Sequence, residues 1–112
     1  GCGGDRDKEK RPRIGSVAFS LSTQVIFTAD NPRTEDVTMI IDDMLQNLSK
    51  AQQKEVLIVN NRIEAIKIAC RLAKKNDIVL VAGKGHEKYQ EINGKKIPFD
   101  DLIELKKSLN II

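Results

Sequence analysis

The segment QVIFTADNPRTEDVTMIIDDMLQNLSK, residues 24–50, contains a predicted strand, a polar loop and a predicted helix in direct succession. Its first part, QVIFTA (24–29), is β-branched and aromatic, which favours a buried strand. In TEDVTMIIDDMLQNLSK (34–50) the apolar residues recur at offsets of three and four, which predicts an amphipathic helix. Its buried face is predicted to consist of Val37, Ile40, Ile41, Met44, Leu45 and Leu48.

The flanking segments extend this pattern in both directions. EVLIVN (55–60) predicts a strand, NRIEAIKIACRLAKKN (61–76) a helix, and DIVLVAG (77–83) a continuous apolar strand buried on both faces of a parallel sheet. KYQEINGKKIPF (88–99) predicts a hairpin turning at Asn93-Gly94, and FDDLIELKKSLN (99–110) a last helix. Strands alternating with helices indicate the α/β class. A short helix over 14–21 is expected to pack through Ile14, Val17, Ala18 and Leu21.

The composition fits one soluble domain and limits the classes of partner that it could bind. The 112 residues are 40% hydrophobic and 31% charged, with a net charge of +3 and no tryptophan, so neither base stacking nor strong attraction to nucleic acid is indicated. No apolar run reaches membrane-spanning length. Cys2 and Cys70 lack metal-ligand spacing and favour a reduced cytoplasmic setting. The chain lacks an initiator Met and starts in a glycine-rich turn, so we expect it to be cut from a longer protein.

Two polar loops follow predicted strands: TADNPR (28–33) and VAGKGHE (81–87). Because the carboxyl ends of parallel strands meet at one edge of a sheet, both loops are expected at the same edge. In the first loop, an Asx-type turn at Asp30 or Asn31 followed by Pro32 accounts for three of the residues. It leaves Arg33 at a helix N-terminus, where a positive charge is mildly unfavourable and where a guanidinium is suited to a carboxylate.

The second loop allows several interpretations. AGKGHE is a glycine turn or a phosphate cradle, although the Walker pattern fails. Glu87, expected near Arg33, could form a plain ion pair with it, or the two could hold the ammonium and carboxylate of an amino acid. A structural role is the better interpretation of His86, the single histidine. The first residues, GCGGDRDKEKR, are either a mobile end or a glycine-supported loop presenting charges to an anion: Asp5, Arg6, Asp7, Lys10 and Arg11.

Taken together, GCGGDRDKEKRP, TADNPR and VAGKGHEKYQ resemble the C-terminal domain of the Mur ligases, and most closely the type that adds meso-diaminopimelate. The resemblance covers nearly the whole chain. It implies a Rossmann-like domain with a mostly parallel sheet and helices on both faces, spanning residues 1–112 of a larger cytoplasmic ligase of peptidoglycan biosynthesis. The domains for ATP and for the substrate UDP-N-acetylmuramoyl-L-alanyl-D-glutamate are then absent.

The resemblance also implies the chemistry and the site. ATP, with Mg²⁺ held mainly outside this chain, phosphorylates a substrate carboxyl group, and the diaminopimelate amine then forms the amide. It implies no catalytic or metal-ligating residue here, and Asp5, Asp7, Lys10 and Arg11 are candidates for an ATP or closure loop. The residues implied to bind diaminopimelate are Arg6, Asp30, Asn31, Pro32, Arg33, Gly83 and Glu87.

Diaminopimelate differs from lysine by a carboxylate on its far carbon, and a bidentate partner such as Arg33 suits that group. Glu87 and the Gly83 carbonyl suit the far ammonium. Isolated from its ligase, the chain is expected to be inactive. The alternatives are a stand-alone α/β module for an anion or nucleotide, and a lysine-adding or folylpolyglutamate-type relative.

Overall fold

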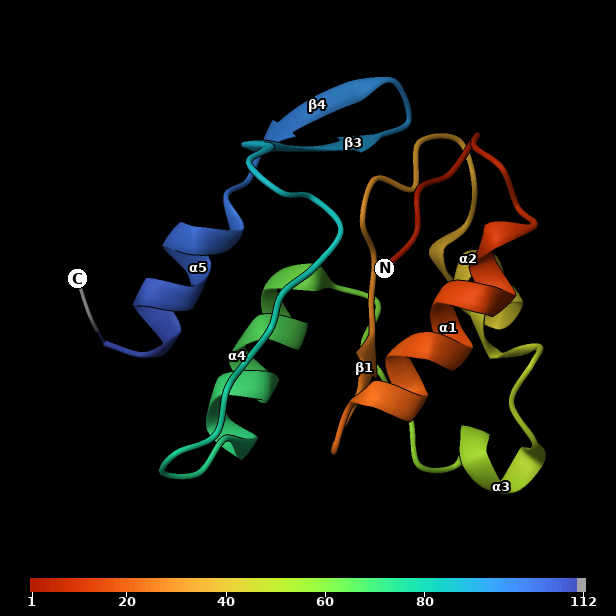
Figure 1. Ribbon diagram of the computed structural model, residues 1–112. Coiled ribbons are helices and arrows are strands. Elements are labelled where there is room, and N and C mark those ends of the chain that lie inside the picture. Colours follow the sequence, from red (N-terminus) through yellow and green to blue (C-terminus); the bar gives the residue numbers. More distant parts are fainter. Residues whose placement is uncertain (111–112) are drawn as a thin grey trace.

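A computed structural model describes residues 1–110. A small parallel sheet lies at the centre, with Ile26 of β1 opposite Leu57 of β2 and Phe27 opposite Ile58. Figure 1 shows β1 running between α4 on one side and the α1–α2 pair on the other, which confirms the α/β class with helices on both faces. The elements, in chain order, are α1 (Lys10–Leu21), β1 (Ile26–Phe27), α2 (Val37–Leu45), α3 (Lys50–Gln53), β2 (Leu57–Ile58), α4 (Arg62–Leu72), β3 (Tyr89–Ile92), β4 (Lys95–Pro98) and α5 (Asp101–Ser108).

The hydrophobic core forms where α2 packs on β1. Phe27 contributes the strand side of this core, and the predicted helix stripe supplies the other, with Val37 partly buried at its edge. Full burial of side chains of this size stabilises a fold by about 1.5–3 kcal/mol each. The helix begins one residue after Asp36, whose carboxylate accepts the N–H of Thr38 as an N-cap. Besides Phe27, the buried core consists of the stripe residues Ile40, Ile41, Met44, Leu45 and Leu48, together with Cys2 and Val56.

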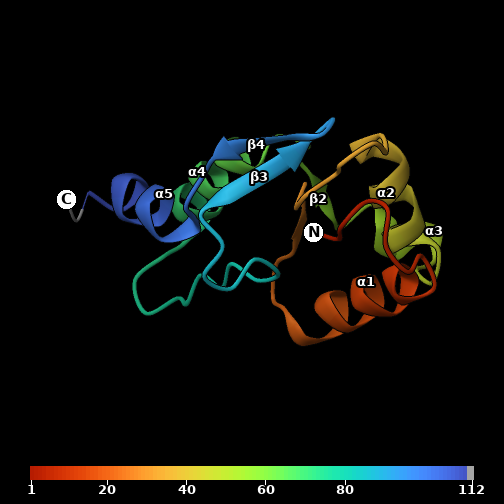
Figure 2. The same ribbon diagram turned by 90° about the horizontal axis from the view of Figure 1, so that it is seen from above.

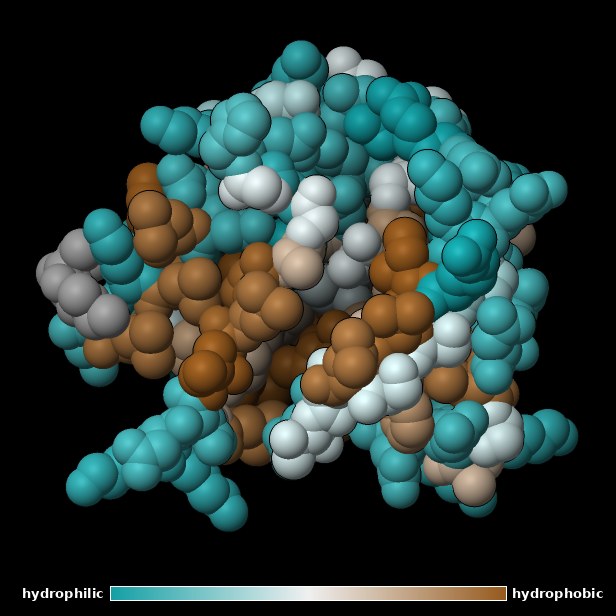
Figure 3. Space-filling view, viewed as in Figure 1, coloured by the Kyte–Doolittle hydropathy of each residue, from teal (hydrophilic) through white to brown (hydrophobic). Residues whose placement is uncertain are grey.

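The face by which α1 packs is not the one the sequence predicts. Ile14, Val17 and Leu21 are exposed, and only Ala18 of the expected set is packed against the core. The reason is Gly15, which lets α1 approach α2 so closely that an added Cβ would lie 1.9 Å from the Met44 carbonyl oxygen. The helix therefore packs through Gly15, Ala18 and the partly buried Phe19, and it leaves its other large apolar residues on the surface (Figure 3).

The strand predicted over residues 77–83 is a second expectation that is wrong, because these residues form no strand within the described part of the chain. Val79 and Val81 are half-buried, but Ile78 is 92% exposed and Leu80 is 84% exposed. The segment thus keeps the side-chain alternation of an extended chain while only one of its faces is covered. A continuous apolar run indicates a strand only where both faces are packed, and that condition is not met here.

The predicted hairpin is confirmed. β3 and β4 are antiparallel, and the turn residues Asn93 and Gly94 have φ values of 50° and 78°. Two successive positive φ values are the signature of a tight hairpin turn, which is why an Asn-Gly pair is favoured there. Figure 2 shows the hairpin lying over the loops that leave the carboxyl end of β1. The last helix, α5, begins after Asp100, which accepts the N–H groups of Leu102 and Ile103.

A buried arginine ties the elements together at this edge. Arg62, at the start of α4, forms a bidentate ion pair with Asp101 of α5 through Nε and Nη2, both at 2.8 Å. Its Nη1 donates to the Ala29 carbonyl at 2.9 Å and its Nη2 to the Ala82 carbonyl at 3.3 Å. One guanidinium thus holds the two segments that lead into residues 30–33 and 83–87 side by side. Across residues 1–110, none of the helices is both long enough and apolar enough to cross a bilayer.

Candidate functional site

Residues 1–6, 29–33 and 83–91 meet around the side chain of Asn31, which is 2% exposed. Its Oδ1 accepts Lys84 Nζ at 2.6 Å and the Glu91 N–H at 2.9 Å. Its Nδ2 donates to Glu87 Oε1 at 3.2 Å, and its backbone carbonyl accepts the Gly4 N–H at 2.8 Å. The prediction that the two loops reach the same edge is confirmed. The predicted Asx-type turn is wrong for Asn31, because the side chain bonds to distant segments instead.

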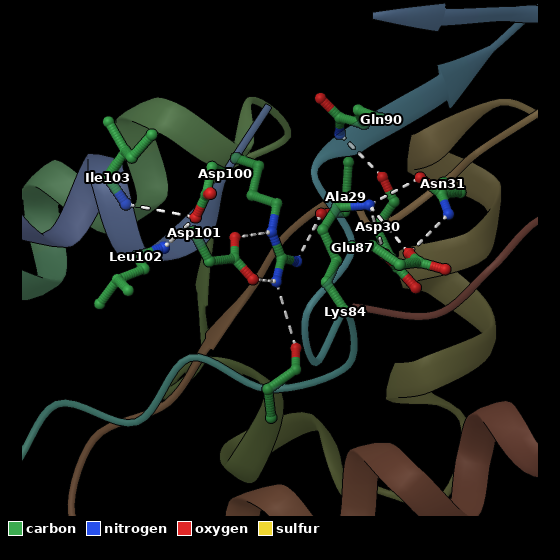
Figure 4. Close-up of polar contacts among 12 residues, drawn as sticks. Ala29, Asp30, Asn31, Lys84, Glu87, Gln90, Asp100, Asp101, Leu102 and Ile103 are labelled. Carbon is green, nitrogen blue, oxygen red and sulfur yellow. Dashed lines mark hydrogen bonds and ion pairs between the residues drawn. The ribbon is translucent and has the colours of Figure 1, made fainter. Parts of the chain in front are cut away.

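The ammonium group of Lys84 is completely buried at the centre of this cluster. It lies 2.9 Å from Asp30 Oδ1 and 3.7 Å from Glu87 Oε1, in addition to its bond to Asn31. A buried ammonium is tolerated only when it is paired and hydrogen-bonded. Lys84 is therefore committed to joining the two loops, and this contact replaces the phosphate cradle as the role of the lysine. Figure 4 shows its side chain reaching toward Asp30 and Asn31.

Arg33 has a left-handed backbone, with φ at 53°. A non-glycine residue in this region is strained by about 1–3 kcal/mol and persists only when its surroundings hold it. The hairpin does so: the Arg33 N–H donates to the Glu91 carbonyl at 3.0 Å, and the Asn93 N–H donates to the Arg33 carbonyl at 2.8 Å. The guanidinium is turned by its Nε toward Glu91 Oε1 at 3.2 Å, and its Nη1 donates to the Gly4 carbonyl at 2.9 Å.

The plain ion pair between Arg33 and Glu87 is not formed. Arg33 pairs with Glu91, and Glu87 pairs with Lys84 and Asn31. Glu87 bonds to the Asn31 side chain and keeps a third of its own side chain exposed. Arg33, in contrast, is linked to Asn31 through Glu91, whose N–H donates to Asn31 Oδ1. The cation and the acid are thus each held by a different partner within one connected network.

Glycines let the segments approach one another. An added Cβ on Gly4 would lie 1.8 Å from the Pro32 carbonyl oxygen, so only glycine allows residues 1–6 to lie against residues 31–33. Gly83 has φ at 111°, and its Cβ position lies 3.9 Å from Asp30 Oδ2, which places this predicted residue beside the first loop. Pro32 is buried at the same contact, and its carbonyl accepts the Glu35 N–H.

The N-terminal loop is ordered, and its charged residues separate into two groups. Arg6 is exposed and bonds only to the neighbouring Asp5 carbonyl, and Lys10 is exposed as well. Asp5 accepts the hydroxyl and N–H of Thr34, and Asp7 accepts the Glu9 N–H. Arg11, in contrast, is 1% exposed and faces inward.

Arg11 forms the second buried cation network. It donates from Nη2 to Glu35 at 2.7 Å and to the Gly3 carbonyl at 2.9 Å, and from Nη1 to Asp43 at 2.9 Å. The hydrogen bonds from the Arg11 guanidinium and then from the Asp5 N–H lower the pKa of Glu35 from 4.5 to about 2. This network fixes residues 3–5 against the start of α2, and it turns Arg11 away from the exposed side of the loop.

Sequence reasoning missed three residues that organise the site: Lys84, Glu91 and Arg62. Lys84 carried a usable signal, since it lies three residues before Glu87 in a loop that was expected to meet Asp30. Glu91 and Arg62 carried none, because their partners Arg33 and Asp101 are 58 and 39 residues away.

These side chains have the chemistry that a small zwitterion would require. Arg33 and the exposed Arg6 can contact a carboxylate, while Glu87 and the Gly83 carbonyl can accept from an ammonium. The residues that the structure describes contain no group of three or more His, Cys, Asp or Glu placed to hold a metal ion.

Comparisons with known proteins identify relatives of this chain. Residues 1–85 match the family model described as Mur ligase, glutamate ligase domain. The UDP-N-acetylmuramoyl-L-alanyl-D-glutamate–2,6-diaminopimelate ligase of Cytophaga hutchinsonii is 49% identical over 112 residues, which are 100% of this chain and 23% of that protein. The ligase of the same name from Parabacteroides distasonis is 53% identical over 106 residues, 95% of this chain and 22% of that protein.

A solved structure titled as the same ligase superposes with a TM-score of 0.91 at 45% identity, covering 99% of this chain and 23% of the other. The chain thus spans less than a quarter of the length of the relatives it matches.

Proposed function

Because this chain belongs to the Mur ligase family, as its glutamate ligase domain, we propose that it binds the amino acid in a ligase that adds meso-diaminopimelate to UDP-N-acetylmuramoyl-L-alanyl-D-glutamate. The relatives that carry this activity in their names are 49–53% identical over nearly all of the chain. In this proposal the substrate- and ATP-binding domains lie outside these 112 residues, the ligase acts in the cytoplasm, and the chain by itself forms no amide.

ATP with Mg²⁺ would activate the substrate carboxyl group for amide formation in the whole ligase. This chain offers no fit for either group: the sequence lacks the Walker pattern, and the described residues lack a metal-ligand cluster. We therefore assign no catalytic step to its residues. Their role in the proposal is to bind and orient the incoming amino acid.

The position of Arg33 carries the proposal. Among the described residues its guanidinium keeps N–H groups free, and the neighbouring network also contains the partly exposed Glu87 carboxylate. The distal carboxylate of diaminopimelate would bind to Arg33, with Arg6 close by on the neighbouring loop. Its distal ammonium would bind to Glu87 and the Gly83 carbonyl. Asp30 and Asn31 would contribute by holding Lys84, and Pro32 by seating the loop against Gly4.

This arrangement would select diaminopimelate over lysine. Lysine has no distal carboxylate, so it would leave Arg33 without its ligand partner in a partly desolvated site. A buried polar group left unpaired costs about 1–3 kcal/mol, and more when it is charged. A hydrogen-bonding site of this kind rejects an analogue that lacks the bonded group more strongly than an apolar pocket rejects one extra methylene.

The test uses the full-length ligase with diaminopimelate or lysine as the amino acid. Wild type is expected to prefer diaminopimelate, and Arg33→Ala to lower kcat/KM for diaminopimelate by about 100-fold while changing that for lysine only a few-fold, because about 3 kcal/mol of a charged contact is lost. Arg71→Ala, which removes an exposed arginine of α4, is the matched control and should leave both values unchanged. A wild-type preference for lysine would overturn the proposal.

A further inference from the structure

We propose that Glu91 determines the amino-acid specificity of this site by holding the Arg33 guanidinium at Nε, so that its remaining N–H groups face the distal carboxylate. The inference rests on the proposed function and deepens it. Glu91 was not among the residues that the sequence singled out, but its side chain forms the ion pair with Arg33 and its carbonyl accepts the Arg33 N–H.

The geometry leaves part of the Arg33 fork open. A guanidinium has five N–H groups in a rigid fork. Glu91 Oε1 forms an ion pair with Nε at 3.2 Å, and the Gly4 carbonyl accepts one hydrogen of Nη1 at 2.9 Å. Within residues 1–110, no hydrogen bond engages Nη2. The Nη2 group therefore remains open to a ligand carboxylate.

The hairpin directs Glu91 toward Arg33 rather than toward its cross-strand neighbour. Glu91 lies opposite Lys96 in the antiparallel register, and opposite charges in such positions normally pair. The Lys96 ammonium instead lies 4.6 Å from the centroid of the Tyr89 ring, in a cation–π contact. Glu91 is consequently free to bind Arg33, and the two side chains are only 27% and 15% exposed.

Backbone and side chain act together in this contact. The Glu91 carbonyl holds the Arg33 N–H in the left-handed conformation, and the Glu91 N–H donates to Asn31 Oδ1. These backbone bonds persist in any Glu91 variant. A substitution at this position therefore tests the side-chain contact with Arg33 while the loop itself stays anchored.

Two variants of the full-length ligase separate positioning from charge. Glu91→Gln keeps an acceptor for Nε, so the ratio of kcat/KM for diaminopimelate to that for lysine should stay within about threefold of wild type. Glu91→Ala removes the acceptor and lets the fork rotate, so the ratio should fall at least tenfold. The loss should be mainly in KM for diaminopimelate, because a carboxylate that does not react is bound equally in the ground and transition states.

The controls keep the outcomes distinct. Lys96→Ala, on the same hairpin face, should leave the ratio unchanged, and the melting temperatures of both Glu91 variants should match wild type. Equal losses in Glu91→Gln and Glu91→Ala, or no loss in either, would overturn the inference. The wild-type preference tests the proposed function separately, so a ligase that prefers diaminopimelate but is insensitive to Glu91→Ala would sink only this inference.

Discussion

Arg11, Arg62 and Lys84 are charged side chains buried almost completely inside the protein, with exposures of 1%, 2% and 3%. Each is bonded to at least one carboxylate, and each links segments that are far apart in the chain. Such pairs add little stability over a well-packed apolar substitute, but removing one partner is costly because the other charge stays buried. These residues therefore specify which segments meet, and the proposed binding site lies among the segments they join.

The Arg11–Glu35 pair makes stability depend on pH. The folded-state pKa of Glu35, about 2, lies below its ordinary value of 4.5. Ionised Glu35 thus stabilises the fold above about pH 4.5, and this contribution is lost as the pH falls toward 2. Its size is on the order of 2–3 kcal/mol, allowing for partial exposure of the side chain.

We expect Glu35→Gln to lower the free energy of unfolding by roughly 2–3 kcal/mol at pH 7, and the difference from wild type to shrink steadily below pH 4.5. Urea unfolding followed by circular dichroism at pH 7, 5 and 3.5 measures this difference directly. A difference that stays constant across that range would show that the pKa of Glu35 is not lowered by folding.

At the scale of elements, the close packing of α1 on α2 depends on Gly15. Alanine normally stabilises a helix interior by about 1 kcal/mol relative to glycine. Here the added Cβ would lie 1.9 Å from the backbone oxygen of Met44, so one of the two helices must shift. Overpacking of this kind typically costs about 1–3 kcal/mol, which exceeds the gain in helix propensity.

We expect Gly15→Ala to lower the free energy of unfolding by about 1–2 kcal/mol in spite of the better helix former. Ser20→Ala, at an exposed position of the same helix, gains propensity without a clash and should be neutral or slightly stabilising. Urea denaturation of the two variants beside wild type makes the comparison. A stabilised Gly15→Ala protein would mean that α1 and α2 are farther apart than described.

Elements whose signals are local were predictable from the sequence. The stripe of α2, the Asn61 cap of α4 and the Asn93-Gly94 turn each depend on residues a few positions apart, and each is present. The buried face of α1 and the absence of a strand at residues 77–83 were not predictable, because both depend on which other segments pack against them. A glycine contact with another helix decides the first, and the missing cover over Ile78 and Leu80 decides the second.

At the scale of the whole molecule, the site was only partly predictable. The rule for parallel strands predicted that residues 30–33 and 83–87 would meet, and the bonds from Asn31 to Lys84 and Glu87 show that they do, although residues 77–83 form no strand. No rule of spacing could find the bidentate contact of Arg62 with Asp101. That contact fixes Arg62, which also bonds to the Ala29 and Ala82 carbonyls just before the two loops.

We expect Arg62→Met to cost about 3–5 kcal/mol of unfolding free energy, because it leaves the carboxylate of Asp101 buried without its partner. The double variant Arg62→Met/Asp101→Leu removes both charges and should recover part of that loss. Glu64→Gln breaks only the exposed pair with Lys67 and should cost less than about 0.5 kcal/mol. Urea unfolding at pH 7 compares the four proteins, and an Arg62→Met chain as stable as Glu64→Gln would contradict the buried pair.

The clustering of distant segments around Asn31 has a consequence for biosynthesis. A nascent chain that has emerged only as far as residue 80 already contains Asn31, Arg33 and Arg62 but lacks their partners, which are Lys84, Glu87, Glu91 and Asp101. Contacts of such long sequence separation form slowly and late. Until α5 has left the ribosome, the unsupported loops and apolar surface should be open to chaperones and proteases.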